Sequence, residues 1–361
     1  MPFQQAFFLL SAFGCRTMVR FIREIQSPDK PVLVLLHNSN HDVWWLVTSE
    51  GPATRFDALT HCMELTKWHI NMKPGSDSTS AAYDPVNNLL ILAQPTIDCI
   101  TAIEPHRDSC GKQLKDIEQT EISMAKYPNR DLIVVNHVEN RLVLIGCESF
   151  DVITLSSMEH HLKVWYNNTH AAYWHDAAYD AYNNRIVTKA NACLTSFSAA
   201  TGDMLHTSGV ILCFYSQSIC VDNRGRIIML AANEFCQFFL SAYTSDLQLI
   251  ATESVNTDGV FPQGIALVGG TCVTPKGFIA FDSLRGNIGF VLSDGKTCCC
   301  WLIPANTWLP NTYEWTVNKH RYAPRNVREV VNEVTNIRSL VPESPLALMP
   351  NELLFLIFEH L

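Results

Sequence analysis

The feature that most constrains the fold of this chain is a pattern that recurs through its middle. Residues 81–103, 124–145, 177–198 and 218–240 each contain a short apolar strand, a polar turn and a further apolar strand. Asp, Asn, Gly and Pro fill the turns, because these residues bend the backbone at low cost. The strands between them are rich in Val, Ile and Leu, which is typical of strands buried on both faces.

A unit of three or four such strands cannot bury both of its faces alone, so it needs similar units on either side. Residues 273–293 and 31–48 repeat the strand, turn, strand order, which brings the number of expected units to six. We take as equivalent the turn positions Asp84, Tyr127, Asp180, Asp222 and Lys276, spaced about 42–54 residues apart. This spacing is typical of four-stranded propeller blades. A β-sandwich is the alternative, although a sandwich should not repeat a motif.

The repeated pattern resembles the NHL-type β-propeller repeat. Residues 140–145 (NRLVLI) are similar to the third strand of that repeat, and residues 287–291 are similar to it without the arginine. The His-Leu start of the family repeat is absent. The resemblance covers about residues 30–300 and implies an all-β fold, a six-bladed NHL-like β-propeller followed by a short C-terminal helical tail.

The chain is expected to have three parts. Residues 1–30 form an N-terminal segment that we expect to close the propeller, residues 31–310 the propeller, and residues 311–361 a linker and helical tail. Apolar residues recur every three or four positions over residues 325–340, and this spacing predicts a helix there. Pro350 then stands where helices begin, with Glu352 in the first turn.

The end of the chain resembles the opening of an F-box, from about residue 346. The match runs over LMPNELLFLIFEHL, but the chain ends after one helix, and F-boxes usually precede their substrate domain. The resemblance implies contact with a Skp- or elongin-type adaptor and a cullin. The residues that would bind the adaptor are Leu348, Pro350, Leu353, Leu354, Ile357 and Phe358. The alternative is that the tail packs against the propeller as part of its fold.

Aromatic residues between strands are a second group of candidates. Exposed aromatic side chains are favoured anchors in protein interfaces. We expect a partner-binding role for Trp165, Tyr166, Tyr173 and Trp174. Ordinary packing between blades is the alternative interpretation.

The sequence contains no pattern that predicts catalysis. We assign no catalytic residue, no metal ligand and no cofactor. Asp84, Asp180 and Asp222 would be the candidate ligands of a metal-dependent propeller hydrolase or lyase, but turn geometry explains an aspartate at each of these positions more simply. The expected function is therefore a protein-interaction module, with a plain propeller scaffold or a metal-dependent enzyme as alternatives.

Composition bears on partners and location. The formal net charge is −9, which argues against nucleic acid as a partner.

The 13 cysteines are an odd number and are scattered through apolar runs. We therefore expect a reducing compartment, the cytoplasm or also the nucleus. No apolar stretch is long enough to span a bilayer. A cleaved signal within residues 1–15 remains an alternative, although no basic residue precedes its apolar run.

Overall fold

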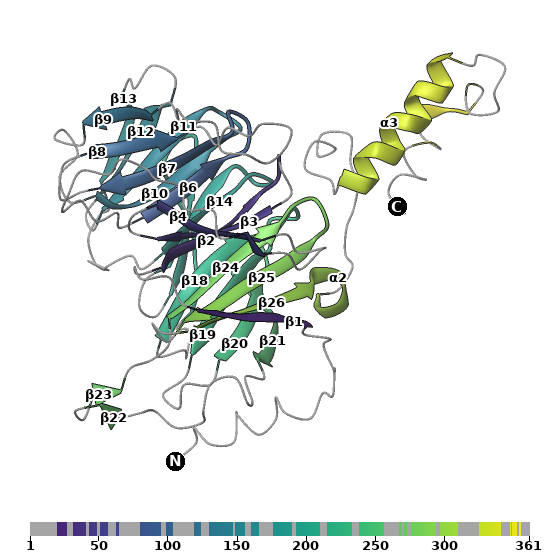
Figure 1. Cartoon of the computed structure of the whole chain (residues 1–361). Helices are drawn as coiled ribbons and strands as arrows, with labels where there is room; N and C mark the ends of the chain where they lie inside the picture. Colours follow the sequence, from purple (N-terminus) through teal and green to yellow (C-terminus); the bar gives the residue numbers. More distant parts are fainter. Residues whose placement is uncertain are drawn as a thin grey trace.

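The fold is built from antiparallel sheets (Figure 1). The computed structural model describes residues 20–26, 32–40, 43–48, 51–56, 63–64, 80–94, 99–103, 119–123, 130–146, 149–155, 160–165, 176–189, 193–209, 215–232, 238–255, 267–268, 271–272, 276–293, 297–309, 325–340, 347, 349–351 and 354. Six four-stranded sheets occur among these residues, together with one two-stranded sheet. We number the larger sheets 1 to 6 in the order in which they follow one another along the chain.

The first three sheets take their strands in sequence order. Sheet 1 consists of β2 (Val32–Asn38), β3 (Val43–Thr48), β4 (Gly51–Phe56) and β5 (Met63–Glu64). Sheet 2 consists of β6 (Ser80–Asp84), β7 (Leu89–Gln94), β8 (Cys99–Ile103) and β9 (Gln119–Ser123). Sheet 3 consists of β10 (Arg130–Asn136), β11 (Arg141–Gly146), β12 (Ser149–Thr154) and β13 (His160–Trp165).

The next two sheets follow the same rule, and the last one does not. Sheet 4 consists of β14 (Asp176–Asp180), β15 (Arg185–Lys189), β16 (Leu194–Ser198) and β17 (Met204–Thr207). Sheet 5 consists of β18 (Tyr215–Val221), β19 (Ile227–Ala232), β20 (Phe238–Tyr243) and β21 (Leu249–Val255). Sheet 6 consists of β24 (Lys276–Asp282), β25 (Asn287–Ser293), β26 (Thr297–Pro304) and β1 (Arg20–Gln26). The two-stranded sheet pairs β22 (Leu267–Val268) with β23 (Thr271–Cys272).

The first strand of each unit lies at the centre of the molecule. Each of the strands β2, β6, β10, β14, β18 and β24 contacts the corresponding strand of the sheet before it and of the sheet after it, and β24 contacts β2. The innermost strands therefore form a closed ring, with the sheets radiating outward. This arrangement of four-stranded antiparallel sheets is that of a β-propeller.

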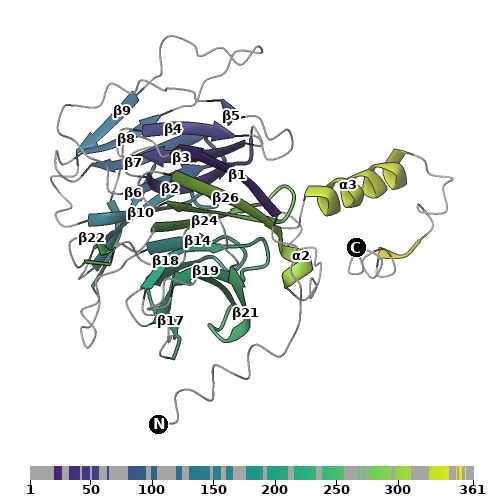
Figure 2. The ribbon, with the colours of Figure 1, turned by 60° about the horizontal axis from the view of Figure 1, so that its bottom comes forward.

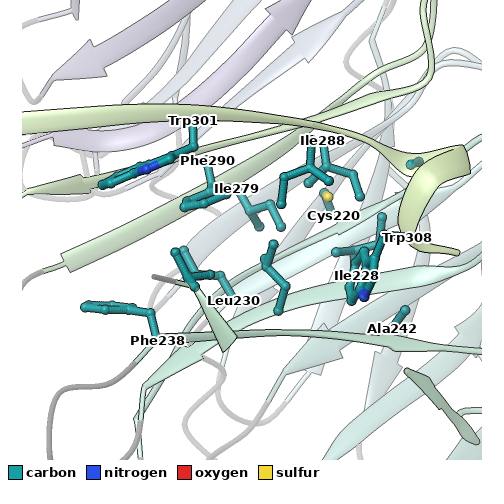
Figure 3. Close-up of a cluster of buried hydrophobic side chains, with 14 of the residues drawn as sticks. Cys220, Ile228, Leu230, Phe238, Ala242, Ile279, Ile288, Phe290, Trp301 and Trp308 are labelled. Atoms are coloured by element: carbon teal, nitrogen blue, oxygen red, sulfur yellow. The ribbon is translucent and has the colours of Figure 1, made fainter. Parts of the chain in front are cut away.

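The core of the propeller is divided between neighbouring sheets. Alternate side chains of an innermost strand point to opposite faces, so one set packs on the preceding sheet and the other on the following sheet. Ala81 packs with Trp45 of sheet 1, whereas Ala82 packs with Ile133 of sheet 3. Figure 3 shows the core between sheets 5 and 6, where the rings of Phe290 and Trp301 stack with centroids 5.1 Å apart.

Cys220 belongs to this core between sheets 5 and 6 and is buried as a free thiol. This agrees with its interpretation as a small apolar residue. Burial, followed by the nearby carboxylates of Asp222 and Asp176, raises the pKa of the Cys220 thiol. The thiol is therefore neutral near neutral pH.

Sheet 6 joins the two ends of the propeller. Its outermost strand, β1, comes from the N-terminal part of the chain and pairs antiparallel with β26. The other three strands come from residues 276–304. The short helix α2 (Ala305–Trp308) follows directly, and its Trp308 side chain covers one end of the core between sheets 5 and 6.

The C-terminal helix α3 (Arg325–Leu340) has the bounds that its apolar spacing predicts. Both views draw it away from the ring of sheets (Figures 1 and 2). Within the part of the chain that the structure describes, neither α3 nor α2 has the length and apolar character that crossing a bilayer requires.

Candidate binding site in the central channel

An acidic or amide side chain ends every innermost strand or, in sheet 5, directly follows it. These six residues, which we call the turn anchors, are Asn38, Asp84, Asn136, Asp180, Asp222 and Asp282. All six are buried. In sheet 2, Asp84 Oδ1 accepts hydrogen bonds from the backbone N–H groups of Val86 at 2.9 Å and Asn87 at 3.3 Å. The side chain thus satisfies the backbone of the turn that follows the strand, as Asp and Asn do in Asx-turns.

Arginine adds to this arrangement in sheets 4 and 5. The Nε atom of Arg185 lies 2.6 Å from Asp180 Oδ2, and the Nε atom of Arg226 lies 2.6 Å from Asp222 Oδ2. The turn anchors Asp84, Asp180 and Asp222 therefore already accept hydrogen bonds from their own turns, and a metal ion would have to compete with these bonds. Among the described residues, no three His, Cys, Asp or Glu side chains converge closely enough to bind a metal ion.

Five turn positions are taken as equivalent from the sequence, and two of these assignments are wrong. The turn anchor of sheet 3 is Asn136, not Tyr127, because Arg130 and Asp131 lie in β10 and the turn comes after that strand. The turn anchor of sheet 6 is Asp282, and Lys276 is instead the first residue of β24. For the same reason, the segments that resemble the third strand of an NHL repeat are β11 and β25, the second strands of their sheets.

Polar contacts bridge all six junctions between neighbouring sheets at the end of the ring that carries these turns. In ring order they are Tyr83 Oη to Asn38 Oδ1 (2.8 Å), Asn87 Nδ2 to Asn140 Oδ1 (3.1 Å), Asn184 Nδ2 to Glu139 Oε1 (3.0 Å), Arg185 Nη2 to the Gly225 carbonyl (3.2 Å), Asn223 Nδ2 to the Ser283 carbonyl (3.0 Å) and His37 Nε2 to Asp282 Oδ1 (3.6 Å). Burial raises the pKa of the Tyr83 hydroxyl, so this group stays protonated and can donate at neutral pH. Hydrogen bonds link five of these junctions and the His37–Asp282 contact closes the sixth, so the turns form one continuous polar rim.

A cavity of about 380 Å³ lies inside the ring and is lined by all six innermost strands. The lining residues that stand four positions before the turn anchors, one from each sheet, are of two kinds. Sheets 1, 3 and 6 place apolar side chains there, and these are Val34, Leu132 and Phe278. Sheets 2, 4 and 5 place polar side chains there, and these are Ser80, Asp176 and Ser218. The channel therefore offers both apolar surface and a carboxylate.

Asp176 is the ionisable group at this level of the channel. Its Oδ2 accepts hydrogen bonds from Ser218 Oγ and the Ile219 N–H group, both at 2.7 Å, and its Oδ1 accepts one from the Ala177 N–H group at 2.8 Å. Burial raises the pKa of Asp176 above its ordinary value, and these hydrogen bonds and the nearby charge of Lys189 oppose that rise. The contacts to Ser218 and Ile219 also link sheet 4 to sheet 5.

Asp176 was not identified as a candidate site residue from the sequence. Ser80 occupies the same place in sheet 2, and its Oγ accepts a hydrogen bond from the Ile133 N–H group of sheet 3 at 3.2 Å. Ser80 and Asp176 both stand four residues before an aspartate turn anchor. Aligning the units on Asp84 and Asp180 would have revealed the shared polar position.

The predicted partner-binding aromatic residues are placed only in part. Trp165 is the last residue of β13, where it is paired with Ser149. Tyr166, Tyr173 and Trp174 lie outside the described residues. Trp44 and Trp45 of β3, by contrast, are fully buried.

The predicted adaptor-binding residues are also placed only in part. The described members of that set are Pro350, which is exposed, and Leu354, which is 3% exposed. The Leu354 N–H group donates to the Pro350 carbonyl at 3.2 Å, so a helical turn begins at Pro350. Outside the described residues lie Leu348, Leu353, Ile357 and Phe358.

The tail folds back on α3. The Arg338 guanidinium of α3 donates a hydrogen bond to the Met349 carbonyl at 2.9 Å and another to the Asn351 side chain. Val331, seven residues before Arg338 and on the same face of α3, is buried. The tail therefore has internal contacts of its own.

Comparisons with known proteins give no family for this chain. No family model matches the sequence, and no curated protein matches it. The solved structures that resemble it include the crystal structure of a nidogen/laminin complex, at 11% identity and a TM-score of 0.46, over 62% of this chain and 80% of that one. They also include Kuenenia stuttgartiensis hydrazine synthase, at 9% identity and a TM-score of 0.47, over 75% of this chain and 79% of that one. The propeller assignment accordingly rests on the closed ring of sheets, and the NHL and F-box resemblances have no family match to support them.

Proposed function

We propose that this chain is a protein-interaction module in which the propeller recognises one protein and the helical tail recruits another. The second protein, in this proposal, is a Skp- or elongin-type adaptor of a cullin ubiquitin ligase. The observation that carries the proposal is the position and surface of α3, which lies away from the propeller (Figure 2).

Two neighbouring faces of α3 differ in what they contact. One face carries Val331 and Arg338 and belongs to the internal packing of the tail. The next face carries Val330 and Ile337, which are 40% and 39% exposed, with the partly buried Val334 between them. Residues at positions i, i+4 and i+7 lie on one side of a helix, so these three form an apolar stripe. Apolar stripes of this kind are common docking surfaces for partner helices.

Burial of Leu354 changes which residues are best placed to bind the adaptor. A leucine whose side chain is buried offers little surface to a partner. The proposal therefore assigns the contact to the apolar stripe of α3, together with Ile357 and Phe358 from the F-box-like segment.

A pull-down from cell lysate, followed by binding to purified Skp- and elongin-type adaptors, tests the proposal. The full chain is compared with a Val330→Asp, Ile337→Asp variant, which places two charges in the stripe. Asn336→Asp is the matched control, because it adds a negative charge to an exposed position of the same helix. We expect the full chain and the control to retain an adaptor and its cullin, and the stripe variant to lose both.

The ligase part of the proposal is wrong if the full chain retains neither adaptor. In that case the protein is a propeller scaffold with a self-contained tail. Retention of the adaptor by the stripe variant, with an unchanged thermal melt, would move the contact away from α3.

A further inference from the structure

The central channel has the features of a small-ligand site. Its volume of about 380 Å³ falls in the range of sites for small molecules, about 300–1,000 Å³. Six strands form its walls, and the polar rim of turns links the sheets that carry those strands. Its lining brings a carboxylate, that of Asp176, to the same level as the apolar side chains of Val34, Leu132 and Phe278.

We propose that the channel binds a primary ammonium group carried on an apolar stem. The ammonium group pairs with the Asp176 carboxylate, and the stem lies along Val34, Leu132 and Phe278. A free alkylamine and a lysine side chain of a partner protein share this chemistry. The inference does not depend on the adaptor proposal, because α3 takes no part in the channel.

The charges around Asp176 favour a cation. The three groups that donate hydrogen bonds to its carboxylate, the hydroxyl of Ser218 and two backbone N–H groups, are all neutral. Lys189, at the paired position of β15, contributes the weakest of the influences that favour the charged form. Cys220 is also a lining residue, but its thiol packs in the core between sheets 5 and 6 and is neutral near neutral pH because burial raises its pKa. A bound ammonium would compensate the carboxylate more directly than any of these groups.

The position of Asp176 in the cavity lining fits this role. Residue 176 as a whole lines the cavity and is partly exposed, although its carboxyl group is buried, whereas Asp180, the turn anchor at the other end of the same strand, is fully buried.

Calorimetric titration of the full chain near neutral pH tests the proposal with three probes of six carbon atoms each. These are n-hexylamine, n-hexanol and hexanoate, which carry a positive, a neutral and a negative head. We expect hexylamine to bind with one site per chain, hexanol to bind at least about tenfold more weakly, and hexanoate not to bind. Equal affinity for hexylamine and hexanol would overturn the proposal, because the carboxylate would then play no part.

Two variants locate the site. Asp176→Asn should weaken hexylamine binding by at least about tenfold, whereas Asp246→Asn, at an exposed aspartate in the turn between β20 and β21, should leave it unchanged. Phe278→Trp enlarges an apolar residue of the channel lining and leaves the carboxylate in place, and it should also weaken binding. It provides the test if Asp176→Asn fails to fold. Wild-type affinity in a folded Asp176→Asn or Phe278→Trp chain would overturn the proposal.

The two sources of the ammonium group are distinguished by one further probe. Nα-acetyl-lysine amide presents the same head on a peptide-like body. Tighter binding of this probe than of hexylamine indicates a lysine of a partner protein, and the reverse order indicates a free amine. The Val330→Asp, Ile337→Asp variant should bind all probes as the wild type does, so failure of the adaptor proposal and failure of this one are separable.

Discussion

Single residues in the turns bring neighbouring sheets into contact. Gly225, in the turn of sheet 5, has a backbone φ of +72°, a left-handed conformation that glycine adopts without cost. A Cβ atom at this position would lie 2.2 Å from Asn183 Nδ2 and 3.0 Å from an oxygen of the Asp180 carboxylate. The turn of sheet 5 can therefore sit against the turn anchor of sheet 4 only because residue 225 has no side chain.

Replacing Gly225 with alanine should destabilise the protein by about 2–4 kcal/mol, because it adds a steric clash to the backbone strain. Chemical denaturation followed by tryptophan fluorescence measures this change. Gly286→Ala is a matched control, since Gly286 has a φ of +71° but open space around its Cβ position. It should cost only about 1 kcal/mol. Equal losses in the two variants would contradict the contact between the turns.

Asp176 makes the stability of the protein depend on pH in a defined direction. Its pKa is raised in the folded chain, mainly by burial, so the folded state holds its proton up to a higher pH than the unfolded state does. Between the ordinary value of 3.8 and the raised folded value, stability should fall as pH rises. The free energy of unfolding of the wild type should therefore increase relative to Asp176→Asn on acidification through this window.

Urea denaturation of both chains across a pH series measures the difference. Ser218→Ala removes a hydroxyl that favours the charged carboxylate. It should raise the folded pKa of Asp176 further and so extend the upper limit of this pH window. A wild-type chain that loses stability relative to Asp176→Asn on acidification would show that the pKa is lowered instead.

Strands of neighbouring sheets approach closely where a small residue faces a large one. Gly289 of β25 lies beneath the indole of Trp44 of β3, and a Cβ atom there would lie 2.4 Å from two carbon atoms of that ring. Trp44 is fully buried, so its ring cannot move aside into solvent. This contact helps to join sheet 6 to sheet 1.

Gly289→Ala should therefore destabilise the protein by about 1–3 kcal/mol through overpacking. Gly209, whose Cβ position is open, provides a control that should change stability by less than about 0.5 kcal/mol. In a double-mutant cycle, Trp44→Phe should relieve part of the cost of Gly289→Ala. Additive losses would mean that the two residues do not press on each other.

The elements of the fold could be predicted from the sequence because turns and apolar strands alternate so clearly. The turn at Asp84 and the one at Asp180 were correctly placed, since Asp and Asn mark them. The register failed in sheet 3, where residues 127–131 (YPNRD) are rich in turn-forming residues and the true turn anchor is an asparagine, Asn136.

The channel site could not be predicted in the same way. Asp176 is one polar residue before an apolar strand, and its position in the ring depends on contacts with Ser218 and Ile219, more than forty residues away. No local pattern encodes such a contact. Likewise, the apolar spacing that predicts the helical tail does not show which of its leucines is buried. The burial of Leu354 is visible only in the structure.

The molecule as a whole is held closed by strand β1. All other described strands of the six sheets join neighbours from the same stretch of chain, but β1 crosses to sheet 6, with Arg20 opposite Leu302 and Gln26 opposite Thr297. Its backbone covers the outer edge of β26, which would otherwise present unpaired N–H and carbonyl groups.

A chain that starts at residue 27 should lose about 3–6 kcal/mol of stability, because it forfeits a ladder of backbone hydrogen bonds along one strand. Thermal unfolding measures the loss. A synthetic peptide of residues 18–27 should restore the midpoint, and a scrambled peptide of the same composition should not. An unchanged midpoint in the shortened chain would show that β1 contributes little to closure.

The pairing of β1 with β26 also sets the timing of folding during synthesis. The ribosome makes β1 among the first strands and β26 last, so an early strand must wait unpaired while five sheets are built. Contacts so distant along the chain are slow to form, because loop closure comes before any gain in energy. During this interval a waiting β1 can pair with the finished sheet 6 of another copy. Chains that are synthesised side by side on one messenger RNA would then exchange their β1 strands. The yield of monomeric propellers should therefore fall as the number of ribosomes on each messenger RNA rises.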